Sequence, residues 1–185
     1  LKSAAYPEFG LYIWWSRRFF LSIRCGGLNK DGLGAHAHND QLSIELQIDG
    51  VDWIADPGSY IYTPTPKHRN LYRSALAHNG PHQSEDEPAR LDEGLFKLED
   101  KSDSQCLHFD ATGFFGYYTG YDEPVSRLIA FGKDRIIIRD SIGSIRPVAA
   151  ELIETIEIIS PKELQDCFTA GVPFSPGYGK VITEI

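Results

Sequence analysis

Methionine is absent from this 185-residue chain, and cysteine and long apolar runs are scarce. The three cysteines, Cys25, Cys106 and Cys167, lie far apart and form no Cys-x-x-Cys pair, which argues against a zinc knuckle and a complete disulfide framework. They are expected to be small buried hydrophobic residues. The alternative is that two of them form one disulfide at the surface. No apolar run approaches the ~20 residues that a membrane-spanning helix needs, so no such helix is expected.

The beginning of the chain also lacks familiar features. The sequence starts at Leu1, and nothing near that end resembles a signal peptide. We therefore expect a piece of a longer polypeptide, whose compartment cannot be read from this end. The length suits a single domain spanning residues 1–185.

Positive charge is the scarcer sign, since Lys and Arg total 18 against 26 Asp and Glu and the net charge is −8. This balance disfavours nucleic acid and anionic membranes as partners, because both are bound by basic surfaces. One segment differs. Between Asp56 and Glu85 there is no acidic residue, but there are three basic residues and three histidines: Lys67, Arg69, Arg73, His68, His78 and His82. The segment is either a local anion site or a loop with solvated charges.

Strand patterns are what the chain does contain. Aromatic and branched residues fill Phe9–Trp15 and Phe19–Cys25, and strict apolar alternation follows at 41–48. Four later segments have similar patterns: Gln105–Asp110, Phe114–Tyr118, Val125–Phe131 and Arg135–Arg139. The segment Glu151–Ile159 could be helix or strand, and its setting favours a strand.

Convincing amphipathic helices are nearly absent. Pro- and Gly-rich loops are expected at Tyr62–His68, Gly80–Ala89 and Pro173–Gly179, and the acidic run Glu85–Glu87 is expected as a solvated turn. Many short strands with almost no helix predict an all-β fold, an antiparallel β-sandwich.

A tight hairpin is predicted at Asp49-Gly50, because a type I′ turn needs two residues with positive φ. Such a turn would pair three apolar residues on each strand: Ile48 with Val51, Leu46 with Trp53, and Ile44 with Ala55.

Two histidines precede this hairpin in the stretch GAHAHND. In an extended chain His36 and His38 leave the same face about 6.5 to 7 Å apart. Both could bind one ion, or one could bind it while the other meets a reacting group. Imidazole nitrogen and carboxylate oxygen are usual Zn²⁺ ligands, and Asp56 and His78 could complete the set. The alternative is a pair of loop histidines with ordinary hydrogen bonds.

Four segments together resemble a known family: GAHAHNDQLSIEL, the turn DG, ADPGSYIY and RNLYRSALAHNG. In order, spacing and residue type they are similar to the C-terminal domain of the heparinase II/III-like polysaccharide lyases, over about Phe9–Asn79. The closing FSPGYG is also similar. The resemblance implies a supersandwich-like β-sandwich domain from an enzyme that cleaves acidic polysaccharides, such as glycosaminoglycans or alginate, by β-elimination.

The resemblance also implies roles for single residues. It implies a catalytic histidine at His36 and substrate-binding neighbours at Tyr60 and Arg73. It also implies one divalent metal, expected to be Zn²⁺, with ligands at His38, Asp56 and His78. After the last ligand the chain departs from the family, because GPHQSEDEP stands where a strand usually follows. His82 in that segment is expected as a loop residue rather than an additional site residue.

The residue types suit the chemistry of a uronate lyase. The enzyme removes the proton at C5 and expels the oxygen at C4, which requires the uronate carboxylate to be neutralised and a base with a pKa near neutral. His36 could be that base or a partner of the carboxylate. The metal is expected to fix the loop that carries His36.

One geometric condition must hold for this ligand set. In the expected hairpin register Asp56 lies opposite Ser43, and His38 is five residues further back, about 17 Å away along an extended chain. The backbone must therefore bend near Asn39-Asp40 if His38 and Asp56 are to reach one ion.

Partners and alternatives follow from the same resemblance. It implies that a helical toroid precedes the sandwich in the parent chain, that the toroid supplies the other catalytic groups, and that the protein is periplasmic or secreted. The rivals are a non-catalytic carbohydrate-binding or assembly sandwich with a structural metal, and a metal-dependent hydrolase. Trp14, Trp15 and Trp53 could form a sugar-stacking surface, although aromatic residues in alternating strands usually belong to the core.

Overall fold

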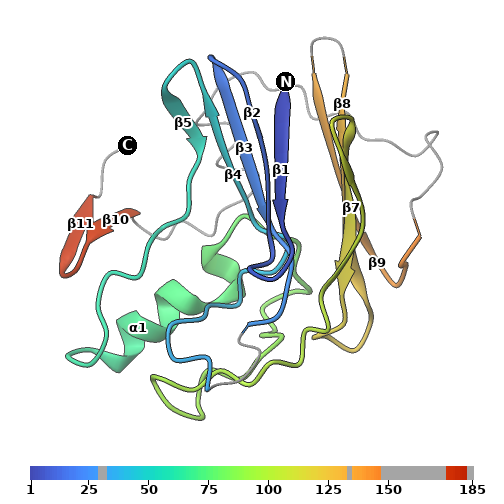
Figure 1. Cartoon of the computed structure of the whole chain (residues 1–185). Coiled ribbons are helices and arrows are strands. Elements are labelled where there is room, and N and C mark those ends of the chain that lie inside the picture. The colour runs from blue at the N-terminus through green and yellow to red at the C-terminus, as the bar shows by residue number, and fades with distance from the viewer. Residues whose placement is uncertain (29–32, 133–134, 147–173, 183–185) are drawn as a thin grey trace.

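The computed structural model describes residues 1–28, 33–132, 135–146 and 174–182. Two antiparallel sheets, one of five strands and one of four, contain nine of the eleven strands in the described residues (Figure 1). The first sheet contains β1 (Lys2–Tyr6), β2 (Leu11–Trp15), β3 (Phe19–Arg24), β4 (Ile44–Ile48) and β5 (Val51–Ile54) in chain order. The second contains β6 (Gln105–Asp110), β7 (Gly113–Tyr118), β8 (Val125–Phe131) and β9 (Ile136–Ile142), also in chain order.

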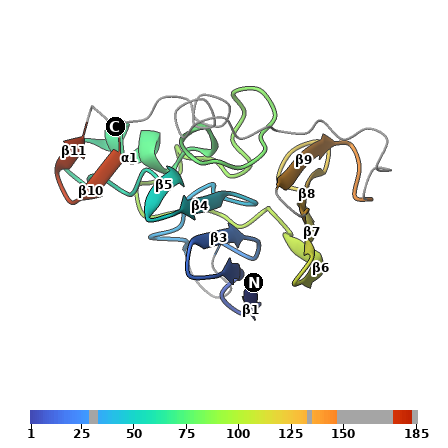
Figure 2. The same ribbon diagram turned by 90° about the horizontal axis from the view of Figure 1, so that it is seen from above.

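The two sheets face each other, as the view from above shows (Figure 2). Trp14 on β2 is completely buried between them, and its ring packs against Phe109 and Phe131 of the other sheet at centroid distances of 4.8 and 5.2 Å. Its indole Nε1 donates a hydrogen bond to the Asp110 carbonyl oxygen, so the ring's polar atom is satisfied. The predicted antiparallel β-sandwich is confirmed.

The strand predictions are mostly confirmed. β6 and β8 have the predicted bounds, and β2, β3, β7 and β9 agree to within three residues at each end. β1 was not predicted, because its sequence KSAAY lacks the aromatic and branched residues that mark strands. It is held by antiparallel pairing with β2.

The hairpin between β4 and β5 is confirmed at its turn, but its register is only partly as predicted. Asp49 and Gly50 both have positive φ, 52° and 80°, and Ile48 pairs with Val51. The other two predicted pairs are wrong, because the register shifts beyond Gln47 and Leu46 pairs with Ile54. This irregularity leaves Trp53 half-buried and directs Ile54 into the core.

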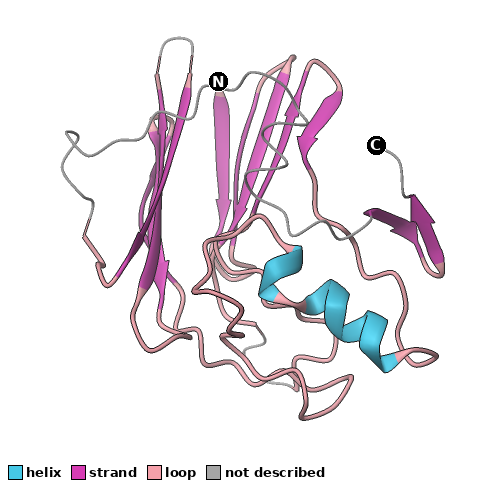
Figure 3. Cartoon of the chain, turned by 180° about the vertical axis from the view of Figure 1, so that it is seen from behind, coloured by secondary structure: helices cyan, strands magenta, loops and turns pink. Residues whose placement is uncertain are grey.

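The helix α1 (Pro66–Arg73) corrects the predicted loop at Tyr62–His68 (Figure 3). Proline at the first helical position supplies a favourable φ and no unused N–H. The buried face of α1 consists of Arg69, Tyr72 and Arg73, at helical spacing but largely polar. Apolar periodicity therefore could not reveal this helix. None of the described helices is long and apolar enough to cross a membrane.

A short 3₁₀ helix, η1 (Ala75–Ala77), continues from α1 toward His78. Ser74 lies between the two helices, and its side-chain oxygen accepts a hydrogen bond from the Leu76 N–H. The predicted loop Gly80–Ala89 follows and contains neither helix nor strand, as expected.

A separate hairpin of β10 (Phe174–Gly177) and β11 (Lys180–Ile182) corrects the predicted loop Pro173–Gly179. It is attached to the segment after β5 by two backbone hydrogen bonds, from Ser175 N–H to the Pro57 oxygen and from Gly179 N–H to the Tyr60 oxygen. Gly58 allows this contact, because a Cβ at that position would lie 2.5 Å from the Ser175 carbonyl oxygen.

Two expectations lie outside the described residues. They are the strand at Glu151–Ile159 and the environment of Cys167. Cys25 and Cys106 are described, and both are free thiols, with Cys25 buried as expected.

Candidate functional site

A cavity of about 1160 Å³ lies among the loops at one end of the five-stranded sheet. The turn between β1 and β2 lines one part of it, and the loop between β3 and β4 lines another. His36, His38 and Asp56, three of the residues predicted to form the site, are among its lining residues. The structure therefore brings these sequence segments to one cavity.

The bend required between His38 and Asp56 is present. A turn spans Asp40 to Ser43, with a hydrogen bond from the Ser43 N–H to the Asp40 oxygen, and Leu42 has a φ of 59°. The left-handed φ reverses the chain direction just before β4 begins. His38 thus lies near the residues after β5, and not beyond the end of a long strand.

Asp56 and His78 are directly hydrogen-bonded. His78 Nδ1 donates to Asp56 Oδ2 over 2.8 Å, and the histidine is buried while the carboxylate is partly exposed. Burial by itself would lower the pKa of His78, but the hydrogen bond and the charge of Asp56 raise it overall. Burial would likewise raise the pKa of Asp56, and the bond from His78 lowers it overall. Both directions favour an ion pair.

His38 is buried beside this pair. Its ring centroid lies 5.2 Å from that of His78, and its Nε2 accepts a hydrogen bond from the Arg69 guanidinium at 2.9 Å. Burial, together with the nearby charges of His78 and Arg69, lowers the pKa of His38 to about 3. Arg69 can only donate, so the imidazole of His38 is neutral with its lone pair on Nε2.

The chemistry of this group fits a bound cation. Two imidazoles and one carboxylate are a usual donor set for Zn²⁺, and the buried Nε2 of His78 has no hydrogen-bond partner among the described residues. In the present conformation, no three His, Cys, Asp or Glu side chains within the described ranges are arranged as a metal-binding group. The bonds from His78 to Asp56 and from Arg69 to His38 occupy atoms that could otherwise serve as ligands.

His36, the predicted catalytic residue, is exposed. Its ring makes edge-to-face contacts with Tyr62, at a centroid distance of 5.6 Å, and with Phe96, at 6.5 Å. The imidazole is therefore accessible from the cavity and is supported by aromatic rings on one side.

Tyr60, predicted as a substrate-binding neighbour, packs toward α1. Its ring contacts His68 and Tyr72 at centroid distances of 5.7 and 5.3 Å, and its φ is 51°. His36 instead contacts Tyr62, two residues further along, and Phe96. The unusual φ at Tyr60 could not be read from the sequence.

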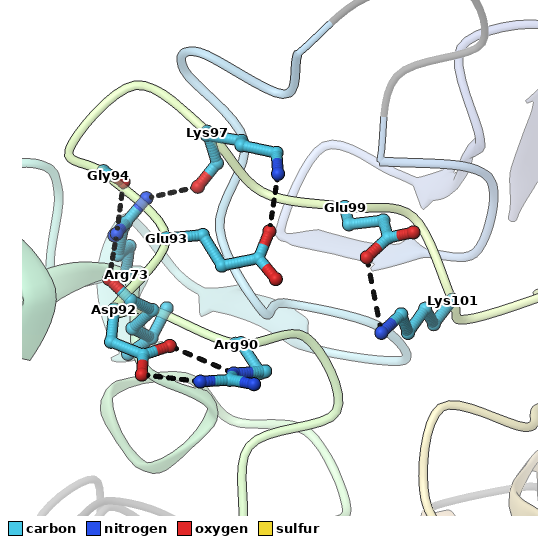
Figure 4. Close-up of polar contacts among 9 residues, drawn as sticks. Arg73, Arg90, Asp92, Glu93, Gly94, Lys97, Glu99 and Lys101 are labelled. Atoms are coloured by element: carbon cyan, nitrogen blue, oxygen red, sulfur yellow. Dashed lines mark hydrogen bonds and ion pairs between the residues drawn. The ribbon is translucent and has the colours of Figure 1, made fainter.

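Arg73, the other predicted neighbour of the substrate, is completely buried. Its guanidinium donates to the carbonyl oxygens of Leu91, Gly94 and Lys97 at 2.6, 2.8 and 3.0 Å (Figure 4). Its Nε donates to Asn70 Oδ1 at 3.0 Å. In this structure Arg73 holds the 91–97 loop against α1, and its side chain is not on the cavity surface.

Other residues that support the site were not predicted. Asn39 donates to Glu87 Oε2 at 2.6 Å, and Glu87 also accepts from the Ala75 N–H and the Ser74 hydroxyl. The expectation that Glu87 belongs to a solvated turn is wrong, because this carboxylate links the loop of His38 to the start of η1. Arg69 stands in the segment without acidic residues and opens the family-like segment RNLYRSALAHNG, but neither signal gave it a role.

His82 lies in the loop that follows His78, as expected. Its Nδ1 is 2.9 Å from the Ser84 carbonyl oxygen, so its ring makes a local loop contact. His82 is not among the residues lining the cavity.

Comparison of the sequence with protein families gives one match. The family model described as heparinase II/III-like, C-terminal, matches residues 1–146. Among curated proteins, no relative matches the sequence.

Solved structures with the same fold include a heparinase III and a heparan sulfate lyase. A heparinase III with methylated lysines has a TM-score of 0.58 at 17% identity, with 76% of this chain and 21% of that chain covered. The heparan sulfate lyase HepC from Pedobacter heparinus has a TM-score of 0.57 at 18% identity, with 77% of this chain and 22% of that chain covered. At these identities the similarity shows a shared fold. The present chain spans about a fifth of the length of either structure.

Proposed function

Because the chain belongs to the heparinase II/III-like C-terminal family, we propose that it is the C-terminal domain of a polysaccharide lyase. The proposed reaction is β-elimination on an acidic, uronate-containing polysaccharide. The observation that carries the proposal is the exposed ring of His36 on the same cavity as His38 and Asp56. The accessible imidazole of His36 lies in the same loop as the buried His38, whose contacts hold that loop in place.

His36 has one of two roles in this proposal. It accepts the C5 proton of the uronate, or it contacts the uronate carboxylate and stabilises the charge that develops when that proton leaves. The leaving oxygen at C4 takes up a proton as the C4–O bond breaks, and the product carries a double bond between C4 and C5. Either role needs an imidazole that the sugar can reach.

The charge of the cavity must be offset before a polyanion can bind. Four carboxylates line it against a single arginine: Glu8, Asp40, Asp56, Asp100 and Arg24. In the proposed function His38, Asp56 and His78 would hold one divalent ion, Zn²⁺ by their donor types. The ion supplies positive charge and fixes the loop that carries His36.

The remaining catalytic groups belong, in this proposal, to an N-terminal helical toroid of the same parent chain. The isolated 185-residue chain is then inactive as a lyase, because it lacks the catalytic groups proposed for the toroid. We place the parent in the periplasm or outside the cell, where a polysaccharide substrate is available. Formation of the unsaturated uronate, followed by its absorbance, measures activity in the chain and in the parent.

Replacement of His36 tests the proposal. His36→Ala in the full-length parent is expected to lower kcat by about 10²–10⁴-fold, the usual contribution of a general acid or base. Bound metal, measured by elemental analysis, is expected to stay unchanged. His108→Ala is the matched control, since His108 is an exposed histidine on β6 outside the cavity, and it should leave turnover unaltered.

Unchanged turnover in His36→Ala would contradict this role. If the parent binds polysaccharide but produces no unsaturated uronate, the alternative function applies, a carbohydrate-binding or assembly sandwich with a structural metal. Loss of hydrolysis on chelation, with saturated products, would instead indicate a metal-dependent hydrolase.

A further inference from the structure

Three aromatic side chains from distant parts of the chain gather beside His36. Tyr62 precedes α1, Phe96 lies in the 91–97 loop, and Tyr178 is in the turn between β10 and β11. The Tyr62 ring is 6.1 Å from the Phe96 ring and 5.9 Å from the Tyr178 ring, with interplanar angles of 26° and 23°. We name Tyr62, Phe96 and Tyr178 the aromatic patch.

The aromatic patch differs from the aromatic residues of the core. Ring pairs centred on Trp14 and Tyr12 in the core meet at 48–67° and are enclosed by both sheets. The rings of the patch are nearly parallel, and Phe96 and Tyr178 are 40% and 60% exposed. Core packing therefore does not account for the position of these rings.

Polar contacts hold the Tyr62 ring and the backbone segments that carry Phe96 and Tyr178. Arg73 binds the carbonyl oxygens of Gly94 and Lys97, on either side of Phe96 (Figure 4). The Arg69 guanidinium lies over the Tyr62 ring, 4.9 Å from its centroid. Tyr178 belongs to the hairpin fixed by backbone bonds to Pro57 and Tyr60. The patch is thus formed before any ligand arrives, which lowers the entropy lost on binding.

We propose that the aromatic patch is a sugar-binding subsite that stacks the apolar face of a pyranose ring. The ring would belong to the same polysaccharide chain, next to the sugar that meets His36. Contact between Tyr62 and His36 makes the patch continuous with the catalytic position. This inference rests on the proposed function for the identity of the polysaccharide, and on the patch itself for the mode of contact.

The patch recognises ring shape more than charge. The nearby charge of Arg69 is not exposed to a ligand, because its side chain is completely buried against Tyr62. Its guanidinium already donates hydrogen bonds to His38 and to the Ala35 carbonyl oxygen. The exposed contact surface is formed by aromatic carbon and by tyrosine hydroxyls, which suit C–H faces and sugar hydroxyls. Binding at the patch should therefore respond weakly to salt, unlike the binding of a uronate carboxylate.

Binding of an unsulfated tetrasaccharide of alternating glucuronate and N-acetylglucosamine to the 185-residue chain tests the inference. Saturation-transfer NMR is expected to show transfer from aromatic protons to sugar ring protons. Tyr178→Ala and Phe96→Ala should each weaken binding about three- to tenfold, the range of one aromatic contact. Tyr178→Phe should retain the affinity, because the ring is preserved.

Phe20→Ala is the matched control, since Phe20 on β3 is exposed to a similar degree, 37%, but lies outside the patch. Affinity equal to wild type in all patch variants, or an equal loss in Phe20→Ala, would overturn the inference. Circular dichroism identifies any variant that has lost its fold. If an alanine variant does so, Tyr178→Phe still compares a preserved ring with wild type.

Kinetics of the full-length parent separate this inference from the proposed function. Tyr178→Ala should raise KM about three- to tenfold and leave kcat nearly unchanged, whereas His36→Ala lowers kcat. If His36→Ala abolishes turnover and no patch variant alters KM, the patch contacts something else, such as the N-terminal domain, and the inference fails alone. If the parent has no lyase activity but the patch variants lose affinity for the tetrasaccharide, the proposed function fails and the inference about the patch stands.

Discussion

The sandwich core and the loop layer beneath it bury side chains by different means. The core is filled by aliphatic and aromatic groups from both sheets. In the loop layer we call six polar side chains, each 9% exposed or less, the polar layer: His38, Asn39, Arg69, Arg73, His78 and Asn79. The core is stabilised by the apolar area that it removes from water. The polar layer is stable only to the extent that its buried groups form hydrogen bonds.

The polar layer does not complete all of these bonds. Four of its buried side-chain atoms have no hydrogen-bond partner in the described residues: Asn39 Oδ1, Arg69 Nε, His78 Nε2 and Asn79 Oδ1. Unsatisfied buried atoms are costly, and their concentration beside a cavity is typical of a binding site. The comparison indicates that the core maintains the fold and that the polar layer maintains a site at some cost in stability.

The largest effect is expected in the core. Trp14→Ala should lower the free energy of unfolding by about 3–5 kcal/mol, because it removes a completely buried ring and leaves a cavity. Urea denaturation of the purified chain measures this change. Trp15→Ala, at a half-buried position on the same strand, should cost clearly less. Equal costs would show that burial between the sheets does not dominate stability.

A smaller effect should separate two arginines of the polar layer that are equally buried. Arg73→Met is expected to cost about 3 kcal/mol, because several loop carbonyl oxygens lose their donor. Arg69→Met should cost less, about 1–2 kcal/mol, because only His38 Nε2 and the Ala35 carbonyl oxygen lose a donor.

Urea denaturation of both variants, with amide hydrogen exchange of the 91–97 loop, checks this difference. Exchange in that loop should accelerate in Arg73→Met and stay near wild type in Arg69→Met. The reverse order would mean that contact with His38 stabilises the fold more than the attachment of the loop does.

The smallest effect is chemical and leaves the fold intact. Burial raises the pKa of the Cys25 thiol to about 12 and also raises the pKa of Cys106, which is less buried. A raised pKa means less thiolate at a given pH, so iodoacetamide at pH near 8 should label Cys106 before Cys25. Peptide mapping by mass spectrometry distinguishes the two sites. Faster labelling of Cys25 would indicate that the core opens near β3.

The sheets could be predicted from the sequence because their residues carry a local signal. Alternation marks β4, and the aromatic and branched residues of β2, β3 and β8 mark strands before any partner is known. The register beyond Asp49-Gly50 could not be predicted, since the irregularity at Trp53 depends on how Ile54 packs in the core. Helix α1 escaped prediction because its buried face is polar.

The sequence named three residues that the structure brings together, but it did not predict their contacts. The family resemblance indicated His38, Asp56 and His78, and the turn at Leu42 brings them together. The bond from Arg69 to His38 joins residues 31 positions apart, and no local pattern predicts it. Their metal-binding role and the catalytic role of His36 stay predictions.

The attachment of the β10–β11 hairpin has a consequence for how related proteins can diverge. The family match ends at residue 146, yet Tyr178 beyond it completes the aromatic patch. Two of the bonds that fasten the hairpin join backbone atoms, which any residue except proline can supply. The turn residue can therefore be exchanged during evolution without loosening the anchor. On the proposal that the patch binds sugar, a single substitution there gives the same scaffold a different preference for neighbouring sugars.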